Sequence, residues 1–184
     1  MSDFDNRKKS GGDDGSSGLL DGTRVSKDDL VFAALGDIDE LSSILGLTKA
    51  VIRDDASAGE PAVGLLEEIQ SDLVRIGAQI AMPENNPRYD TLDTIIPADV
   101  AKIDKFVKTY TAKVELPKEF ILPGGTVTGA QVDIARAVCR RAERAVVSCI
   151  ARKNMSRLDD CQSYLNRLSE LLFILARWLE NATG

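Results

Sequence analysis

Histidine is absent from this chain of 184 residues. Its absence excludes acid–base catalysis by an imidazole, a Ser-His-Asp triad and every zinc site that needs a histidine ligand. Aromatic residues are also scarce, at 5% of the chain, so alanine, leucine, isoleucine and valine must supply most of the core. No apolar run approaches the roughly 20 residues of a membrane helix, and we therefore expect no membrane span.

Cysteine occurs only three times, as Cys139, Cys149 and Cys161. This spacing fits neither a Cys-x-x-Cys pair nor a zinc framework, so the sequence assigns no metal ligands. Cys139 and Cys149 fall at apolar positions of a helical pattern, which predicts that they are small buried hydrophobic residues. An odd number of cysteines without a signal-peptide pattern predicts a reducing, cytoplasmic location.

Positive charge does not predominate: 23 Lys and Arg stand against 29 Asp and Glu, giving a formal net charge of −6. That balance argues against general nucleic-acid binding, although it allows a local basic pocket. The 43% hydrophobic and 28% charged content is typical of a globular protein, and the length suits one domain with a sizeable core.

The chain divides near residue 28 into two parts. Residues 1–28 are polar and rich in glycine and serine, which indicates an N-terminal arm rather than a helix. Residues 29–184 carry apolar residues at three- and four-residue spacing, which predicts helices. These helices span about residues 29–52, 61–82, 100–110, 128–151 and 159–181. No segment alternates for long enough to predict a strand, so the predicted fold is an all-α, antiparallel five-helix bundle with a glycine-rich arm.

The same periodicity predicts which residues form the core. The first and second helices would bury Phe32, Leu35, Ile38, Leu41, Leu45 and Thr48, and then Leu66, Ile69, Leu73, Ile76 and Ile80. The third would bury Val100, Ile103, Phe106, Val107 and Tyr110. The fourth and fifth would bury Ala130, Ile134, Val138, Ala142, Ala145 and Cys149, and then Leu165, Leu168, Leu172, Leu175 and Leu179.

The arm has the composition of a phosphate-binding loop. Successive backbone N–H groups in a glycine-rich segment can form a nest that holds phosphate oxygens. Nearby carboxylates at Asp13 and Asp14, with the hydroxyls of Ser16 and Ser17, are suitable partners for Mg²⁺. Lys27 would add a positive charge beside a nucleotide, or is an ordinary surface lysine. The segment is not a Walker A loop, because no Gly-Lys-Ser/Thr ends it, and the alternative is a flexible lead-in.

A row of arginines marks the fourth predicted helix. Arg136, Arg140 and Arg144 follow one another at four-residue spacing, so they share a face and repel by a few tenths of a kcal/mol per pair. Glu143 offsets only part of this repulsion. An unmatched basic row favours an anion, and guanidinium groups suit phosphate because they donate two aligned hydrogen bonds. The alternative is a solvated face that pairs with acidic neighbours.

Two further polar positions lie within predicted helices. Asp39 stands between Asp37 and Glu40, but carboxylates one or two positions apart on a helix diverge, which disfavours a paired acid–base site. Asp39 could instead meet Arg136 across a packed interface. The amide of Asn166 could recognise an adenine edge or a ribose, or simply bond to the backbone.

Four blocks of the sequence, taken together, carry a family resemblance. They are residues 12–19 with 24–29, residues 36–46, residues 120–125 with 136–144, and residues 164–173. In this order the blocks resemble the signature blocks of PduO-type ATP:cob(I)alamin adenosyltransferases. The resemblance covers nearly the whole chain from Gly12 onward. The arginine-rich block and the Asn-Arg-Leu-Ser block at residues 166–169 are the most specific parts.

The resemblance implies a homotrimer with active sites between subunits, and transfer of the 5′-deoxyadenosyl group of ATP to cob(I)alamin with release of triphosphate. It also implies Mg²⁺ as a cofactor and a reductase that donates electrons. The residues implied to surround the ATP phosphates are Gly12, Asp13, Gly15, Ser16, Ser17, Lys27 and Arg140. Glu143 and Asn166 would complete the nucleotide pocket.

The resemblance assigns three more residues to the corrinoid side of the site. Asp39 and Arg136 would form a salt bridge across the subunit interface, next to the corrinoid. Phe120 would press on the lower face of the corrin ring and exclude the axial ligand. The lack of histidine agrees with this, because no protein imidazole can then ligate the cobalt.

One block departs from the family pattern. The arm of the family usually begins Thr-x-Thr-Gly-Asp-x-Gly, whereas this chain has Lys9 and Gly11 where the threonines belong. Two hydroxyls that could contact phosphate or metal are therefore missing, and we expect weaker or rearranged ATP binding. The alternatives to an active transferase are a corrinoid-binding or delivery protein with little ATP turnover, and a structural bundle whose basic row pairs internally.

Overall fold

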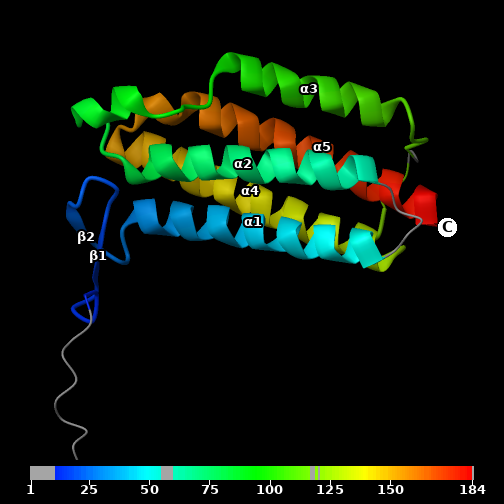
Figure 1. The fold of residues 1–184 in the computed structure, drawn as a ribbon, viewed down its shortest axis with the longest axis horizontal. Coiled ribbons are helices and arrows are strands. Elements are labelled where there is room, and N and C mark those ends of the chain that lie inside the picture. Colours follow the sequence, from blue (N-terminus) through cyan, green and yellow to red (C-terminus); the bar gives the residue numbers. More distant parts are fainter. Residues whose placement is uncertain (1–10, 55–59, 117–118, 120, 184) are drawn as a thin grey trace, which may run out of the picture.

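The computed structural model describes residues 11–54, 60–116, 119 and 121–183. Five long helices form a bundle, and a short hairpin lies beyond the end at which α1 begins (Figure 1). The helices are α1 Leu30–Asp54, α2 Glu60–Ala81, α3 Pro97–Thr111, α4 Val127–Lys153 and α5 Asp159–Thr183. Short 3-10 helices, η2 Pro87–Thr91 and η3 Ser156–Leu158, precede α3 and α5. The prediction of five helices is confirmed.

The hairpin is a feature that the sequence pattern did not predict. Strands β1 Ser16–Gly18 and β2 Arg24–Ser26 pair antiparallel, with Ser17 opposite Val25. The expectation that the chain contains no strand is therefore wrong. Three residues are too few for the two-residue alternation of a strand to be recognised.

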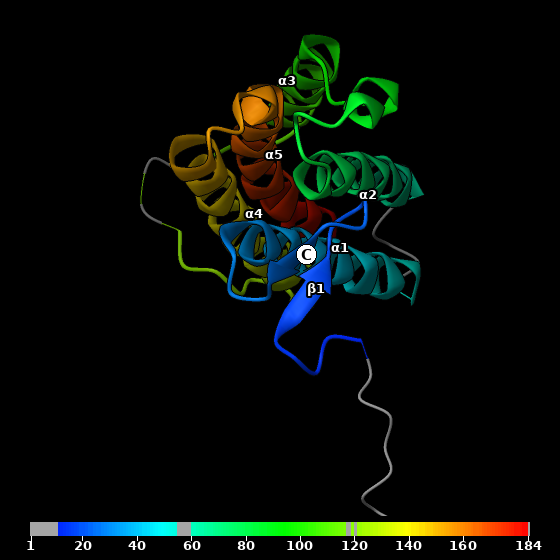
Figure 2. The ribbon, with the colours of Figure 1, turned by 90° about the vertical axis from the view of Figure 1, so that its left-hand side faces the viewer.

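The helices pack in two connected groups. Helix α1 packs against α2 and α4, while α5 packs against α4 and α3 (Figure 2). Each helix runs antiparallel to the next one in the chain, whereas α3 and α5 run in the same direction (Figure 1). The predicted stripes of α2 and α5 are confirmed, because every residue predicted to be buried there is at most 1% exposed.

The predicted faces of α1 and α4 are confirmed in part. The residues buried as predicted are Ile38, Leu41, Leu45 and Thr48 in α1, and Val138, Ala142 and Cys149 in α4. In α1 the buried residues near the N-terminus are Val31 and Ala34, whereas Phe32 and Leu35 are only partly buried. In α4, Ile134 is 54% exposed. Because α4 contacts both α1 and α5, residues on two of its sides are buried, and a single predicted stripe includes only some of them. Buried residues of α4 that the pattern missed are Val132, Ala135 and Val146.

The third helix is covered less than the others. Ile103 and Tyr110 are buried as predicted, but Val100, Phe106 and Val107 are only partly buried against the core. Among the described elements, α3 makes extensive contacts with α5 alone, so only one face of α3 is covered. In the described ranges, no helix combines the length and apolar character that a bilayer crossing requires.

Candidate active site

The described part of the arm folds into a tight loop that closes on β2. Gly12 has φ +108° and Gly15 has φ +78°, a left-handed backbone that other residues rarely adopt. The Gly15 N–H donates to the Gly12 carbonyl at 3.2 Å, and the Lys27 N–H donates to the Gly15 carbonyl at 2.8 Å. The Lys27 ammonium donates to the Gly12 carbonyl at 2.8 Å. Gly12, Gly15 and Lys27 are thus brought together, as the resemblance implied.

A second set of contacts orders the outer side of this loop. The Asp14 carboxylate accepts from the N–H of Ser16 at 2.9 Å and from its hydroxyl at 2.8 Å. These hydrogen bonds, with Arg24 nearby, lower the pKa of Asp14. Arg24 also donates from Nε to the Ser16 hydroxyl at 3.0 Å. Because successive side chains of a strand alternate, Ser16 and Ser17 point to opposite faces of the hairpin.

A cavity of about 500 Å³ lies along α4 and the start of α5. The three residues predicted to bind nucleotide from these helices, Arg140, Glu143 and Asn166, line it together with Arg144, Val147 and Ser148. Arg140 is exposed and has no carboxylate partner within 4 Å among the described residues. Two arginines against one glutamate leave the cavity positively charged, which favours an anionic ligand.

Arg136 lies on the same face of α4 and stacks on an aromatic ring. Its guanidinium carbon is 5.5 Å from the ring centre of Phe173, and that of Arg177 is 5.7 Å from the same ring. Arg177 is paired with Asp133 and Glu180. Among the described residues Arg136 has no such carboxylate, so its charge remains available to a partner.

Asp39 is not brought to Arg136 within one chain. It lies in a groove of about 320 Å³ between α1 and α2, where Val74 is 71% exposed. Arg136 instead faces the α4–α5 side, over Phe173. The two residues therefore occupy different faces of the bundle, and their predicted ion pair can form only between two copies of the chain.

The arm and the Arg140 cavity are likewise separated within one chain. An ion pair of 2.5 Å between Lys153 and Asp29 fixes the C-terminal end of α4 beside the start of α1, where the hairpin attaches (Figure 1). At 1.5 Å per residue, Arg140 lies about 20 Å further along α4. One chain thus holds two halves of the predicted nucleotide site at different places.

Known proteins resemble this chain over most of its length. A model of the cobalamin adenosyltransferase family matches residues 8–179. This chain belongs to that family. The adenosyltransferase is 42% identical to a cobalamin adenosyltransferase of Cupriavidus metallidurans, over 94% of this chain and 87% of the relative. It is 37% identical to the corrinoid adenosyltransferase MMAB of Bos taurus, over 94% of this chain and 70% of the relative.

Solved structures of relatives share the fold of the adenosyltransferase. A single-residue variant of the PduO-type ATP:corrinoid adenosyltransferase from Lactobacillus reuteri, complexed with cobalamin and ATP, has a TM-score of 0.84 at 31% identity and covers 93% of this chain and 91% of its own. Another variant of that enzyme, complexed with ATP, gives 0.83 at 32% identity, covering 93% and 92%. The prediction of a PduO-type corrinoid adenosyltransferase is confirmed.

Two further arginines of α4 in the adenosyltransferase make contacts within the chain. Arg141 pairs with Asp37 at 2.8 Å and with Glu40, so it joins α4 to α1. Sequence reasoning left it unassigned, although Asp37 and Glu40 at three-residue spacing were a usable signal. The Arg144 side chain donates to the Arg140 carbonyl of its own helix at 3.0 Å.

The three cysteines are free and buried, and those predicted to be small core residues are confirmed as such. Burial raises the pKa of Cys161 to about 12 and also raises that of Cys139. A thiolate is therefore strongly disfavoured at both positions, which excludes them as nucleophiles of the adenosyltransferase at neutral pH.

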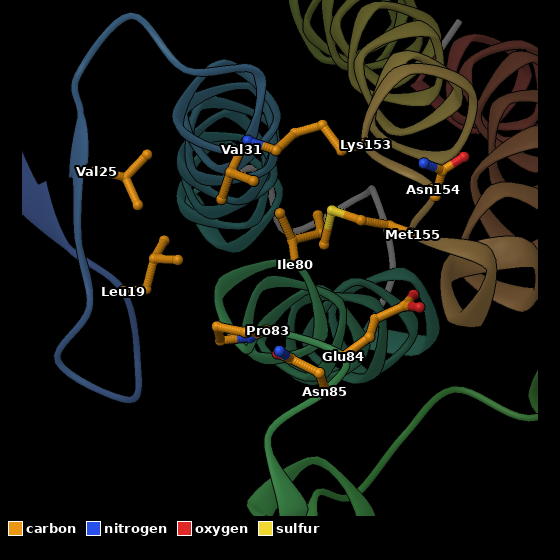
Figure 3. A pocket seen from close by; sticks show the side chains of 10 residues that line it. All are labelled: Leu19, Val25, Val31, Ile80, Pro83, Glu84, Asn85, Lys153, Asn154 and Met155. Atoms are coloured by element: carbon orange, nitrogen blue, oxygen red, sulfur yellow. The ribbon is translucent and has the colours of Figure 1, made fainter.

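A separate pocket of about 300 Å³ lies where the hairpin meets the bundle (Figure 3). Leu19 and Val25 from the hairpin face it from one side, and Val31 and Ile80 face it from α1 and α2. Its one lysine, Lys153, is already paired with Asp29. The remaining lining residues are Pro83, Glu84, Asn85, Asn154 and Met155. We interpret the pocket as part of the apolar contact between the hairpin and the bundle. No predicted site residue lines it.

The described residues contain no cluster of three or more carboxylates or thiols that could hold a metal by themselves. The arm offers Asp13 and Asp14, both exposed. This donor set fits Mg²⁺ that is held mainly by substrate phosphates and water, which is its usual mode beside a nucleotide. Phe120 and Lys9 lie outside the described residues, so their predicted roles remain predictions.

Proposed function

We propose that this chain transfers the 5′-deoxyadenosyl group of ATP to cob(I)alamin, with adenosylcobalamin and triphosphate as products. The observation that carries the proposal is the grouping of Arg140, Glu143 and Asn166 around one positively charged cavity. These residues come from two helices, and the family resemblance had implied all three as nucleotide ligands. A cavity of about 500 Å³ lies within the range typical of small-molecule sites.

We further propose that the site is completed between subunits of a homotrimer. In support, Arg140 lies about 20 Å along α4 from the helix end beside which the arm attaches, so we expect a single ATP to meet both only if they come from different copies. The groove at Asp39 exposes Val74, and the face of Arg136 and Arg140 exposes Val147. A cyclic assembly in which one face meets the other would cover both apolar residues and pair Asp39 with Arg136.

The proposed reaction is a displacement at C5′ of the ribose. The cobalt of cob(I)alamin supplies the electron pair for the new Co–C5′ bond, while the C5′–O bond breaks and its electrons leave with the triphosphate. Negative charge therefore grows on the phosphate side, where Arg140 from one subunit and Lys27 with the glycine loop from another would hold it. No side chain needs to remove a proton, in agreement with the histidine-free composition.

Mg²⁺, when bound, would neutralise part of the triphosphate charge, with Asp13 or Asp14 within reach of its water shell. Asn166 and Glu143 would orient the nucleoside, since an amide and a carboxylate recognise the polar edges of adenine and ribose. Phe120 is proposed to form an apolar wall below the corrin that keeps a lower ligand from the cobalt. A separate reductase is also proposed, because forming cob(I)alamin requires an electron that ATP does not supply.

The chain's cellular location is proposed from its thiols. Three free cysteines without a disulfide suit a reducing compartment, and we propose the cytoplasm.

The deciding experiment mixes the protein with ATP, Mg²⁺ and chemically reduced cobalamin and follows the corrinoid spectrum. We expect adenosylcobalamin and triphosphate to form in equal amounts. Corrinoid binding without either product would instead establish a binding or delivery protein, the alternative suggested by Lys9 and Gly11 in place of the family's threonines. A flat nucleotide titration that Arg140→Ala does not change would indicate a purely structural bundle.

A further inference from the structure

A buried ionic network joins the last part of α5 to the first part of α4. These two helix ends lie at the opposite end of the bundle from the hairpin (Figure 1). Arg177 pairs with Asp133 of α4 at 2.5 Å and with Glu180 of its own helix at 2.9 Å. The side chains of Arg177, Asp133 and Glu180 are only 6%, 11% and 17% exposed. At such burial, each charge requires its partners, because an unpaired buried charge is strongly destabilising.

Glu180 extends this network to the segment that leads into α4. Its Oε1 accepts the backbone N–H of Gly125 at 3.1 Å, across 55 positions of the sequence. Gly125 precedes Thr126, whose hydroxyl accepts the Gly129 N–H and so caps the start of α4. The carboxylate of Glu180 therefore fixes where the segment meets the helix.

Two glycines leave room for this carboxylate. A Cβ added to Gly125 would lie 2.8 Å from Glu180 Oε1, and one added to Gly129 would lie 2.6 Å from Glu180 Cγ. Gly129 is in the first turn of α4 without a left-handed backbone, where alanine would favour the helix by about 1 kcal/mol. Glycine at this position is explained by the close approach of Glu180 rather than by the backbone.

The network also affects the net positive charge around Arg136 of α4, beside the proposed corrinoid site. Arg136 and Arg177 both lie over the ring of Phe173, so they share one small region. Asp133 and Glu180 neutralise Arg177 inside the chain, whereas Arg136 keeps an unpaired charge among the described residues. Removing Glu180 would leave Arg177 with one carboxylate and would change the field at Arg136.

We propose that Glu180 is a positioning residue for the corrinoid side of the site. It holds the segment 121–126 against α5 through Gly125 and keeps Arg177 from competing with Arg136. That segment directly follows Phe120, and Arg136 projects from the helix that the segment begins. The inference rests on the proposed function, in which Phe120 and Arg136 border the corrinoid.

The test compares Glu180→Ala with Glu180→Gln in the full-length protein. We expect Glu180→Ala to raise the KM for cob(I)alamin about tenfold, as loss of one charged hydrogen bond would, and to lower the yield of four-coordinate cob(II)alamin in its absorption spectrum. The KM for ATP should change less than twofold. Glu180→Gln keeps an acceptor for Gly125 and should restore most of the spectroscopic signal. If it restores none, positioning through Gly125 is refuted.

The matched control is Glu170→Ala. Glu170 lies on the same helix in an equivalent pair with Arg167, at 3.6 Å, but is about half exposed. It should leave the spectrum and both KM values unchanged. If it changes them as much as Glu180→Ala does, the effect belongs to any charge on α5 and the proposal fails.

A second variant displaces the carboxylate of Glu180 without removing it. Gly129→Ala should displace Glu180 and reproduce the cob(I)alamin defect, while the double variant Gly129→Ala/Glu180→Ala should be no worse than either single variant. Additive defects would overturn the shared mechanism. If Glu180→Ala does not fold, Gly129→Ala decides by itself, because an unchanged KM for cob(I)alamin in that variant would refute the inference. A wild-type protein that forms no adenosylcobalamin refutes the proposed function, whereas an active wild type with an indistinguishable Glu180→Ala refutes only this inference.

Discussion

Four arginines on α4 show how differently one residue type is used over nine positions. Arg141 is held by Asp37 and Glu40 of α1, and Arg144 bonds to a carbonyl of its own helix. Arg136 stacks on Phe173, and Arg140 faces the cavity. At the residue scale, among the described residues, Arg141 is the one of these four whose charge pairs with carboxylates of the same chain, whereas Arg136, Arg140 and Arg144 form no such pair.

Replacing Arg140 tests its assignment as a phosphate ligand. We expect Arg140→Ala to lower kcat/KM for ATP about 10- to 100-fold, because a hydrogen bond to a charged group contributes about 1.5–3 kcal/mol. Arg140→Lys should recover part of this, since an ammonium keeps the charge but not the paired donors. Arg152→Ala, on the exposed last turn of the same helix, is the control and should match wild type. Steady-state kinetics and calorimetric ATP titration provide the measurement; unchanged ATP affinity in Arg140→Ala would contradict the assignment.

At the scale of elements, α3 is attached to the bundle by a polar junction as well as by its apolar face. Arg75 of α2 pairs with Asp72 at 2.7 Å and with Asp99 at 2.9 Å, in the first turn of α3. It also donates to the Thr94 carbonyl at 2.6 Å, and the Tyr164 hydroxyl of α5 donates to Asp72 at 2.9 Å. One guanidinium therefore connects α2, the start of α3 and, through Asp72, α5.

Removing this guanidinium should loosen α3 first. Arg75→Met leaves Asp72 and Asp99 mostly buried without their cation, and we expect the free energy of unfolding to fall by about 3 kcal/mol. Hydrogen exchange should accelerate in α3 more than in α2. Arg167→Met is the control, because Arg167 contacts Asp104 of α3 only through an exposed pair that should contribute less than about 1 kcal/mol. Equal losses in the two variants, measured by denaturant unfolding, would contradict the special role of Arg75.

The same junction gives a signed pH dependence. Burial alone would raise the pKa of Asp99, but hydrogen bonds from Arg75 and the Ile96 N–H outweigh it and lower the pKa below 3.8. A carboxyl with a lowered pKa stabilises the fold fully above its unfolded value, and that stability is lost as the pH falls through the folded pKa. The wild type should therefore lose this contribution below about pH 4, and Arg75→Met should lose less over the same window. Thermal melts from pH 7 to pH 3 measure the difference; parallel curves would refute it.

At the scale of the whole molecule, the division of the site between subunits makes a prediction by complementation. Lys27→Ala disables the arm and Arg140→Ala disables the cavity, so each homotrimer should have little activity. If every site combines the arm of one subunit with the cavity of another, randomly mixed trimers should recover about a quarter of wild-type activity, because one pairing in four is intact. The variants are unfolded and refolded together, and each is refolded alone as a control. No recovery in trimers shown to be mixed, or a monomeric mass by light scattering, would contradict an intersubunit site.

Sequence periodicity determined the elements of this protein but not all of their faces. The five helices and the buried stripes of α2 and α5 follow from local spacing, because each side chain's direction on a helix repeats every 3.6 residues. The same spacing misplaced Ile134, since α4 lies against both α1 and α5. It also missed the hairpin, whose strands of three residues are held by pairing and by the bond from Leu20 N–H to the Ala81 carbonyl.

The candidate site divides in a similar way. Family resemblance was enough to select Arg140, Glu143 and Asn166, and the structure brings them together around one cavity. The separation of the arm from that cavity, the commitment of Arg141 to α1 and the contact between Glu180 and Gly125 were decided only by tertiary structure. Each depends on residues far apart in the chain, and no local pattern encodes which side chains meet when one helix packs against another.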